Sequence, residues 1–114
     1  WLARDTMKAT MLEAFNALKS GGFFGVVEHR APEGSSMEYM TTSGYVSQSL
    51  AIEVAESVGF TLVETSEINA NLKDTKDHPK GVWTLPPSYR LKDENRSKYE
   101  AMGESDRMTL LFMK

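Results

Sequence analysis

The chain has 114 residues, the length of one small domain. Hydrophobic residues make up 40% of it and charged residues 25%, close to globular averages, which excludes a disordered, collagen-like or mucin-like chain. Thirteen basic against sixteen acidic residues give a formal net charge of -3, which excludes the strongly basic surface of a duplex nucleic-acid binder. Zero cysteines exclude disulfides, thiolate metal sites and cysteine nucleophiles.

The N-terminal stretch has neither an apolar signal core nor a small-residue cleavage site. No apolar run reaches the roughly 18 residues that a membrane span needs, so we expect no membrane association. The chain begins with Trp1 instead of Met, which predicts a processed chain, a truncated one, or one cut from a longer reading frame. The compartment stays open because an export signal could precede Trp1: cytoplasmic is slightly favoured, and periplasmic is the alternative.

The first predicted element is an amphipathic helix over residues 6–19. Met7, Met11 and Phe15 share one face at helical spacing, and a Gly-Gly pair follows the helix. The next run, residues 23–27, is short and continuously apolar. This pattern predicts a strand that is buried on both faces, as in parallel α/β sheets.

The middle of the chain predicts a loop, a helix and a strand. Residues 32–43 are rich in Gly, Ser and Thr, which indicates a loop. An apolar stripe at helical spacing predicts a second helix over residues 45–58, ended by a glycine. Residues 60–68 predict a strand, with Leu62 and Val63 as its buried part.

The last part of the chain is a long polar stretch, residues 69–106, followed by an apolar strand over residues 108–113. A short helix is possible within residues 93–102. The strand–helix–strand unit predicts a right-handed parallel crossover. Because no crossover helix of useful length precedes the closing strand, we expect that strand to run antiparallel. The fold class is therefore α/β, in the order helix-strand-helix-strand-strand.

One junction in this order is familiar. Residues 17–27 read Ala-Leu-Lys-Ser-Gly-Gly-Phe-Phe-Gly-Val-Val and resemble the helix-to-strand junction in the second half of class I S-adenosylmethionine-dependent methyltransferases. Residues 53–60 resemble the helix end before the sixth strand of that fold, and residues 105–114 resemble its antiparallel seventh strand. Residues 27–31 and 76–78 are similar to a group of bacterial predicted methyltransferases. The resemblance covers most of the chain.

The resemblance implies the C-terminal half of a Rossmann-like methyltransferase sheet, with S-adenosylmethionine as cofactor and a small molecule as methyl acceptor. In that family, a Gly-rich loop after the first strand holds the cofactor. No such loop is present, because Gly21 and Gly22 precede a strand and Gly34 and Gly44 are isolated. The resemblance therefore implies a single partial domain over residues 1–114. We expect it to be inactive alone, and no residue is assigned to the cofactor.

Three polar residues follow the first predicted strand and are the candidate catalytic group. Open α/β sheets bind ligands outside the carboxyl ends of their strands. His29 is therefore a candidate general base or substrate-orienting group, with Glu28 or Arg30 setting its protonation state. The alternative is that these residues only mark the point where a strand leaves the core.

Further polar and aromatic residues are candidates for lining a substrate site. Asp77 and His78 either line such a site or lie on a solvated loop. A metal site is not expected, because two histidines cannot supply the three or four ligands that metal sites use. The aromatic residues of the loops either cover an apolar substrate or pin the loops to the domain. They are Tyr39, Tyr45, Trp83 and Tyr89.

A second function remains open beside the methyltransferase, that of a non-catalytic α/β module that associates with itself or with a partner. The strand over residues 23–27 would normally have neighbours from a missing half. Its free edge predicts a homodimer or a larger assembly. A small hydrolase is set aside, because the chain has no Gly-x-Ser-x-Gly nucleophile elbow.

Overall fold

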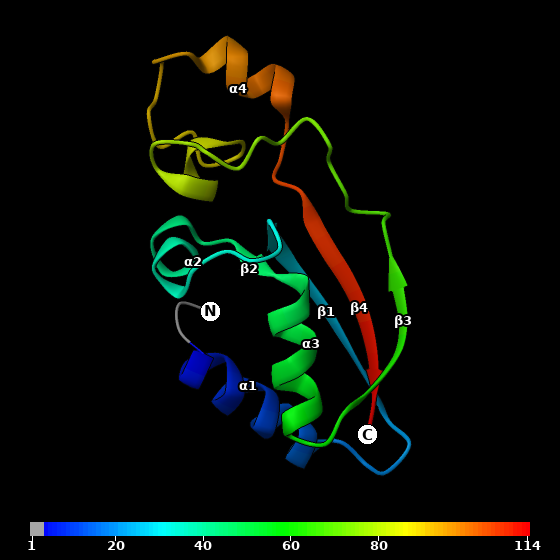
Figure 1. The fold of residues 1–114 in the computed structure, drawn as a ribbon. Helices are drawn as coiled ribbons and strands as arrows, with labels where there is room; N and C mark the ends of the chain where they lie inside the picture. The colour runs from blue at the N-terminus through cyan, green and yellow to red at the C-terminus, as the bar shows by residue number, and fades with distance from the viewer. Residues whose placement is uncertain (1–3) are drawn as a thin grey trace.

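The computed structural model describes residues 4–114, so Trp1 lies outside the described residues. The fold is α/β with one open, mixed sheet in the strand order β2-β1-β4-β3 (Figure 1). The elements in chain order are α1 (Arg4–Ala17), β1 (Phe23–Ala31), α2 (Met37–Ser43), β2 (Val46–Ser47), α3 (Gln48–Ser57), β3 (Thr61–Ser66), the 3-10 helix η1 (Gly81–Thr84), α4 (Arg96–Met102) and β4 (Arg107–Met113).

The closing strand β4 lies between β1 and β3. It runs antiparallel to both, which confirms the direction expected from the sequence. Its register with β1 runs from Phe23 opposite Met113 to His29 opposite Arg107. The two strands of the predicted crossover unit are therefore parallel to one another but are not neighbours. β2 runs parallel to β1 and pairs only with the last two residues of β1.

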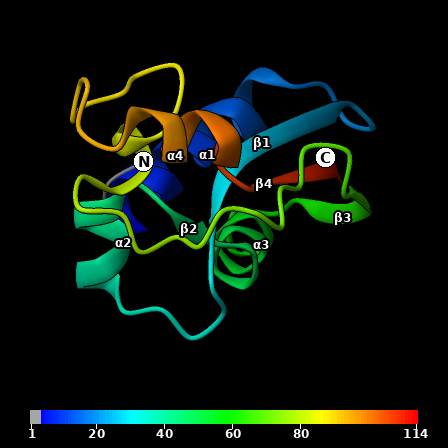
Figure 2. The ribbon, with the colours of Figure 1, turned by 90° about the horizontal axis from the view of Figure 1, so that it is seen from above.

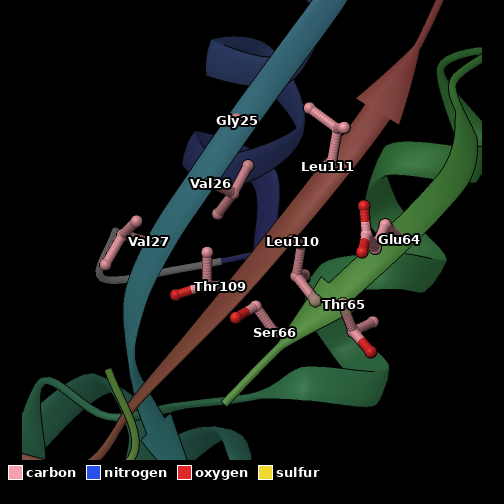
Figure 3. Close-up of a pocket in the computed structure, with 9 residues that line it drawn as sticks. All are labelled: Gly25, Val26, Val27, Glu64, Thr65, Ser66, Thr109, Leu110 and Leu111. Carbon is pink, nitrogen blue, oxygen red and sulfur yellow. The ribbon is translucent and has the colours of Figure 1, made fainter. Parts of the chain in front are cut away.

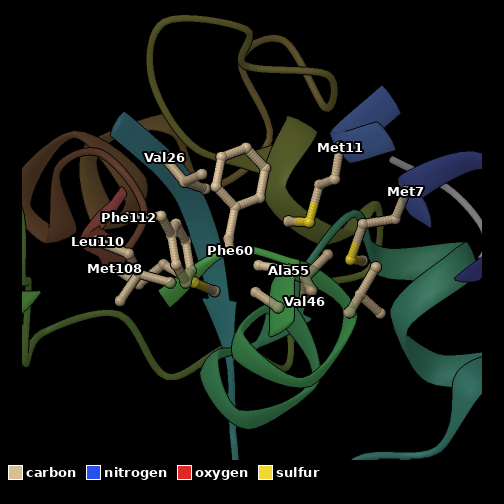
Figure 4. Packing of buried hydrophobic residues seen from close by; sticks show 11 residues of the cluster. Met7, Met11, Val26, Val46, Ala55, Phe60, Met108, Leu110 and Phe112 are labelled. Carbon is tan, nitrogen blue, oxygen red and sulfur yellow. The ribbon is translucent and has the colours of Figure 1, made fainter. Parts of the chain in front are cut away.

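The hydrophobic core lies on one face of the sheet, between the strands and the helices α1 and α3 (Figure 4). Alternate residues of β1 and β4 point into it, because successive side chains of a strand face opposite sides. Phe60 lies at its centre. The Phe60 ring contacts the rings of Phe15 and Phe24 at centroid distances of 5.2 Å and that of Phe112 at 5.9 Å.

The opposite face of the sheet is uncovered in the described part of the chain. Phe23 is 59% exposed, Val27 55% and Met113 37%. The prediction that residues 23–27 are buried on both faces is therefore wrong. The prediction assumed that a second layer covers this face of the sheet, and whether such a layer forms depends on tertiary packing. Val63, predicted as buried, is 48% exposed, because the register shifts between Leu62 and Glu64 at a β-bulge.

The helices α2 and α3 differ from the sequence predictions, and α1 begins and ends two residues earlier than predicted. The predicted loop over residues 32–43 contains α2, whose N-cap Ser36 accepts a hydrogen bond from the Tyr39 N–H. The second helix begins at Gln48 because Ser47 is extended in β2 and caps α3 by accepting from the Leu50 N–H. The short helix expected within residues 93–102 is confirmed as α4.

The irregular segments gather at one end of the sheet. β1 finishes there and β4 begins there, and α2, η1, α4 and the connecting segments of residues 67–106 surround this end (Figures 1 and 2). No helix within residues 4–114 is both long enough and apolar enough to cross a membrane.

Candidate functional site at the carboxyl end of β1

His29 lies near the carboxyl end of β1, with its Nδ1 atom 2.5 Å from the Ser105 Oγ. Burial lowers the pKa of His29 from its ordinary value of 6.5, against an opposing effect of the Glu28 carboxylate. The imidazole is therefore neutral at pH 7. Within the described residues, Nε2 has no hydrogen-bond partner, and no buried side-chain nitrogen is left without one.

Glu28 does not contact the imidazole ring. Its Oε1 accepts a hydrogen bond of 2.8 Å from the backbone N–H of His29. The carboxylate therefore covers a backbone donor of β1 and influences the ring only through its charge.

Arg30 links several elements through its guanidinium group. Nε and Nη2 donate to the two carboxylate oxygens of Asp106 at 2.9 and 3.0 Å, and Nη2 also donates to Glu67 at 2.7 Å. Nη1 donates to Gln48 at 3.0 Å. Hydrogen bonds to Asp106 and then to Glu67 raise the pKa of Arg30 above its ordinary value. Because these donors are engaged, Arg30 is a structural cation here and not a free ligand for substrate.

Asp106 lies under this cation and is almost completely buried. Lys76 adds a second ion pair, with its Nζ 2.9 Å from Asp106 Oδ2. Burial alone would raise the pKa of Asp106, but the hydrogen bonds from Arg30 and Lys76 hold it well below its ordinary value. The carboxylate therefore stays charged across the physiological pH range.

Asp74 is the second buried carboxylate, and its side chain is fully inaccessible. Oδ2 accepts from the Tyr45 hydroxyl at 2.7 Å and from the Asp106 N–H at 2.9 Å. Oδ1 accepts from the Lys76 N–H at 2.9 Å and lies 2.7 Å from His78 Nε2. Burial and the bond to Asp74 raise the pKa of Tyr45. Asp74 thus joins the 69–106 segment to the end of the sheet.

A polar pocket of about 270 Å³ lies beside this network, between α2 and the segment that precedes η1. Tyr39, Asp77 and His78 line it. The Tyr39 hydroxyl donates to the Lys76 carbonyl at 2.6 Å, and Asp77 accepts from the Thr75 hydroxyl at 2.6 Å. That bond from Thr75 lowers the pKa of Asp77.

The structure brings most of the candidate residues to one end of the sheet. Tyr39 stacks on Tyr45 at a centroid distance of 6.3 Å, and the Tyr45 ring lies 6.4 Å from the His29 ring. Tyr45 itself is fully buried, so it packs beneath the site residues and does not line a surface that a substrate could reach. Trp83 packs against Gly44 and the small cluster around Tyr45, which fits the pinning interpretation.

Sequence reasoning missed the two residues at the centre of the network, Asp74 and Asp106. Both are aspartates in a long polar stretch, where nothing local separates a buried carboxylate from a solvated one. A weak sequence signal for a buried, paired Asp74 is that Lys76 and His78 follow it by two and four residues. Ser105, the partner of the His29 ring, gives no signal in the sequence.

The described residues do not form a complete site for S-adenosylmethionine. The loop after β1 contains a single glycine, Gly34, and its Glu33 is already bound to Ser49. Glu67, the acidic residue just after β3, is paired with Arg30. Over residues 4–114, no group of three or more His, Cys, Asp and Glu side chains could hold a metal ion.

Comparisons of this chain with protein-family models, with curated proteins and with solved structures find no match.

Proposed function

We propose that this chain contributes the C-terminal part of an S-adenosylmethionine-dependent methyltransferase, and that a different polypeptide segment supplies the cofactor loop. The observation that carries the proposal is the neutral His29 imidazole near the carboxyl end of β1, whose Nε2 has no hydrogen-bond partner within the described residues. This is the end at which open α/β sheets bind ligands. The order of elements and the antiparallel β4 support the resemblance from which the proposal starts.

His29 acts in this proposal as the general base for a small methyl acceptor. This role requires the tautomer in which Nδ1–H donates to Ser105 Oγ, because the lone pair of Nε2 is then available and meets no partner within the described residues. Nε2 then accepts the proton that an acceptor N–H or O–H releases as that atom becomes methylated. A base with a lowered pKa is unprotonated at pH 7 and is ready for this step.

The network behind His29 has a positioning role. Tyr45, Asp74 and Asp106 are buried and fully hydrogen-bonded, so they hold the end of β1 and the 69–106 segment in one arrangement. Methyl transfer depends largely on proximity and alignment, which a rigid support of this kind provides.

A calorimetric titration with S-adenosylhomocysteine tests the proposal. The two samples are the 114-residue chain and the same chain preceded by the residues encoded upstream of Trp1. We expect saturable binding to the longer protein and none to the chain alone, because residues 4–114 lack a cofactor loop. Absence of binding to the longer protein would contradict the methyltransferase proposal. Binding to the chain alone would contradict the assignment of the cofactor loop to another segment.

A second function, self-association without catalysis, is favoured by a different observation. One face of the sheet carries exposed apolar side chains, among them Phe23 and Val27. Monomeric proteins seldom leave such residues together on a strand with a free edge.

A further inference from the structure

β1 has a free edge along most of its length. β4 pairs with β1 from Phe23 to His29, whereas β2 reaches only Arg30 and Ala31 on the other side. In the part of the chain that the structure describes, no strand pairs with residues 23–29 on that side. The N–H of His29 is covered by the Glu28 carboxylate. The stretch available for pairing is therefore residues 23–27.

The backbone groups that face this edge follow from the register. The Arg30 N–H donates to the Asp106 carbonyl at 2.8 Å, and the Lys114 N–H donates to the Gly22 carbonyl at 2.9 Å. Even-numbered residues of β1 thus bond toward β4. Because the direction alternates along a strand, the N–H and C=O groups of Phe23, Gly25 and Val27 point to the free edge.

The opposite edge of the sheet is protected by its own sequence. β3 carries a bulge between Leu62 and Glu64, and Glu64 adds an exposed charge. Bulges and charges are the features that keep edge strands from pairing. The free stretch of β1 has no charge, no proline and no bulge, so it is the edge that remains competent for strand addition.

Gly25, at the middle of this stretch, is not required by the fold of the chain itself. A Cβ atom built there would meet nothing within 4 Å, and the φ of Gly25 is not positive. It lies at the base of a shallow hollow of about 280 Å³ on the uncovered face, bordered by Val27 and Leu111 (Figure 3). A glycine inside a strand often marks the close approach of another group.

We propose that two copies of this chain join through the free edges of β1, in an antiparallel pair with Gly25 of each copy on the two-fold axis. Phe23 then lies opposite Val27 of the second copy, which makes an apolar cross-strand pair. The Phe23 ring also lies diagonal to the second Gly25, within reach of the hollow above it. The edge is therefore self-complementary, which is why a second copy is the occupant. The dimer is that of the 114-residue chain and goes beyond the proposed chemistry, because a separate segment that supplied a neighbouring strand would occupy the same edge of β1 in place of the second copy.

Disulfide trapping tests the register directly, because the chain has no cysteine of its own. In a hydrogen-bonded antiparallel pair the facing Cα atoms are about 5.5 Å apart, within disulfide range. Gly25→Cys should therefore form a covalent dimer under mild oxidation. Thr109→Cys is the matched control: it lies one strand further in, opposite Val27, so three strand spacings across the sheet and four residues along it would separate the two copies of Thr109 by roughly 20 Å. Equal trapping of both variants, or none of Gly25→Cys, overturns the proposal.

Sedimentation equilibrium supplies a test that needs no cysteine. The unmodified chain should approach twice its mass of 12.8 kDa as its concentration rises. Val27→Lys places a charge opposite Phe23 of the second copy and should weaken the dimer by roughly tenfold or more. Thr109→Lys, on the neighbouring strand of the same face, should change the affinity far less. A monomer at every concentration, or equal weakening by both variants, overturns the proposal. Neither measurement depends on cofactor binding, so the two proposals fail separately.

Discussion

At the scale of single residues, His29 is the side chain with the clearest chemical potential. Its Nδ1 is held by Ser105, and its Nε2 has no partner within the described residues. Arg30, its neighbour in sequence, has every guanidinium nitrogen engaged. Adjacent residues of β1 therefore differ in role because they project from opposite faces of the strand.

The titration of His29 is the first prediction. Because burial lowers its pKa in the folded state, the unfolded chain binds a proton more readily near pH 6.5. Stability therefore falls as the pH drops below 6.5, and His29→Gln should reduce this part of the pH dependence. The chain has only two histidines, so NMR titration of the ring protons can follow His29 directly, with His29→Gln identifying its signal. A pKa at or above 6.5 would contradict the prediction.

At the scale of elements, the end of the sheet depends on contacts between segments that are far apart in the sequence. Arg30 from β1 binds Gln48 at the start of α3, Glu67 after β3 and Asp106 before β4. Asp74 adds the 69–106 segment through its bonds to Tyr45 and Asp106. These polar contacts join the segments at the end of the sheet where the irregular segments lie, beyond the hydrophobic core.

Arg30→Met tests how much these contacts contribute to the free energy of unfolding. Removing the cation leaves the buried Asp106 with Lys76 as its remaining cationic partner, and breaking a buried ion pair costs about 3 kcal/mol. Arg107→Met is a suitable control, because its pair with Glu104 is largely exposed and contributes less than about 1 kcal/mol. Urea unfolding of both variants measures the two costs. Similar losses for the two would show that the Arg30 network adds little to stability.

At the scale of the whole molecule, the described chain has one helical layer and one sheet. α1 and α3 cover one face of the sheet, and the other face stays open (Figure 1). The apolar residues on the open face and the free edge of β1 lie next to one another, so one assembly step can engage Phe23, Gly25 and Val27 together.

Thermal unfolding should therefore depend on protein concentration. If a second copy binds only the folded state, mass action raises the unfolding midpoint as the concentration increases. We expect a rise of several degrees over a hundredfold range of concentration, and none for Val27→Lys. Calorimetry or circular dichroism at matched scan rates measures this. A midpoint of the unmodified chain that does not move with concentration would count against the dimer.

The sequence by itself predicted the elements whose signals are local. The apolar runs at residues 23–27 and 108–113 predicted β1 and β4, and helical spacing predicted α1. The change to polar residues at Glu28 and His29 pointed to the end of the sheet where the candidate site lies. These features depend on neighbours a few residues away, so periodicity and capping are sufficient to find them.

Only the tertiary structure decided which strands are neighbours, which carboxylates are buried and which face is open. Asp74 meets Tyr45 across 29 positions and Asp106 across 32, so no local pattern marks it as buried. The insertion of β4 between β1 and β3 likewise depends on pairing between distant segments. The apolar sequence of β1 is compatible with a strand that is covered on one face or on both. Hydrophobic residues favour burial, but the packing of the whole chain decides which of them are buried.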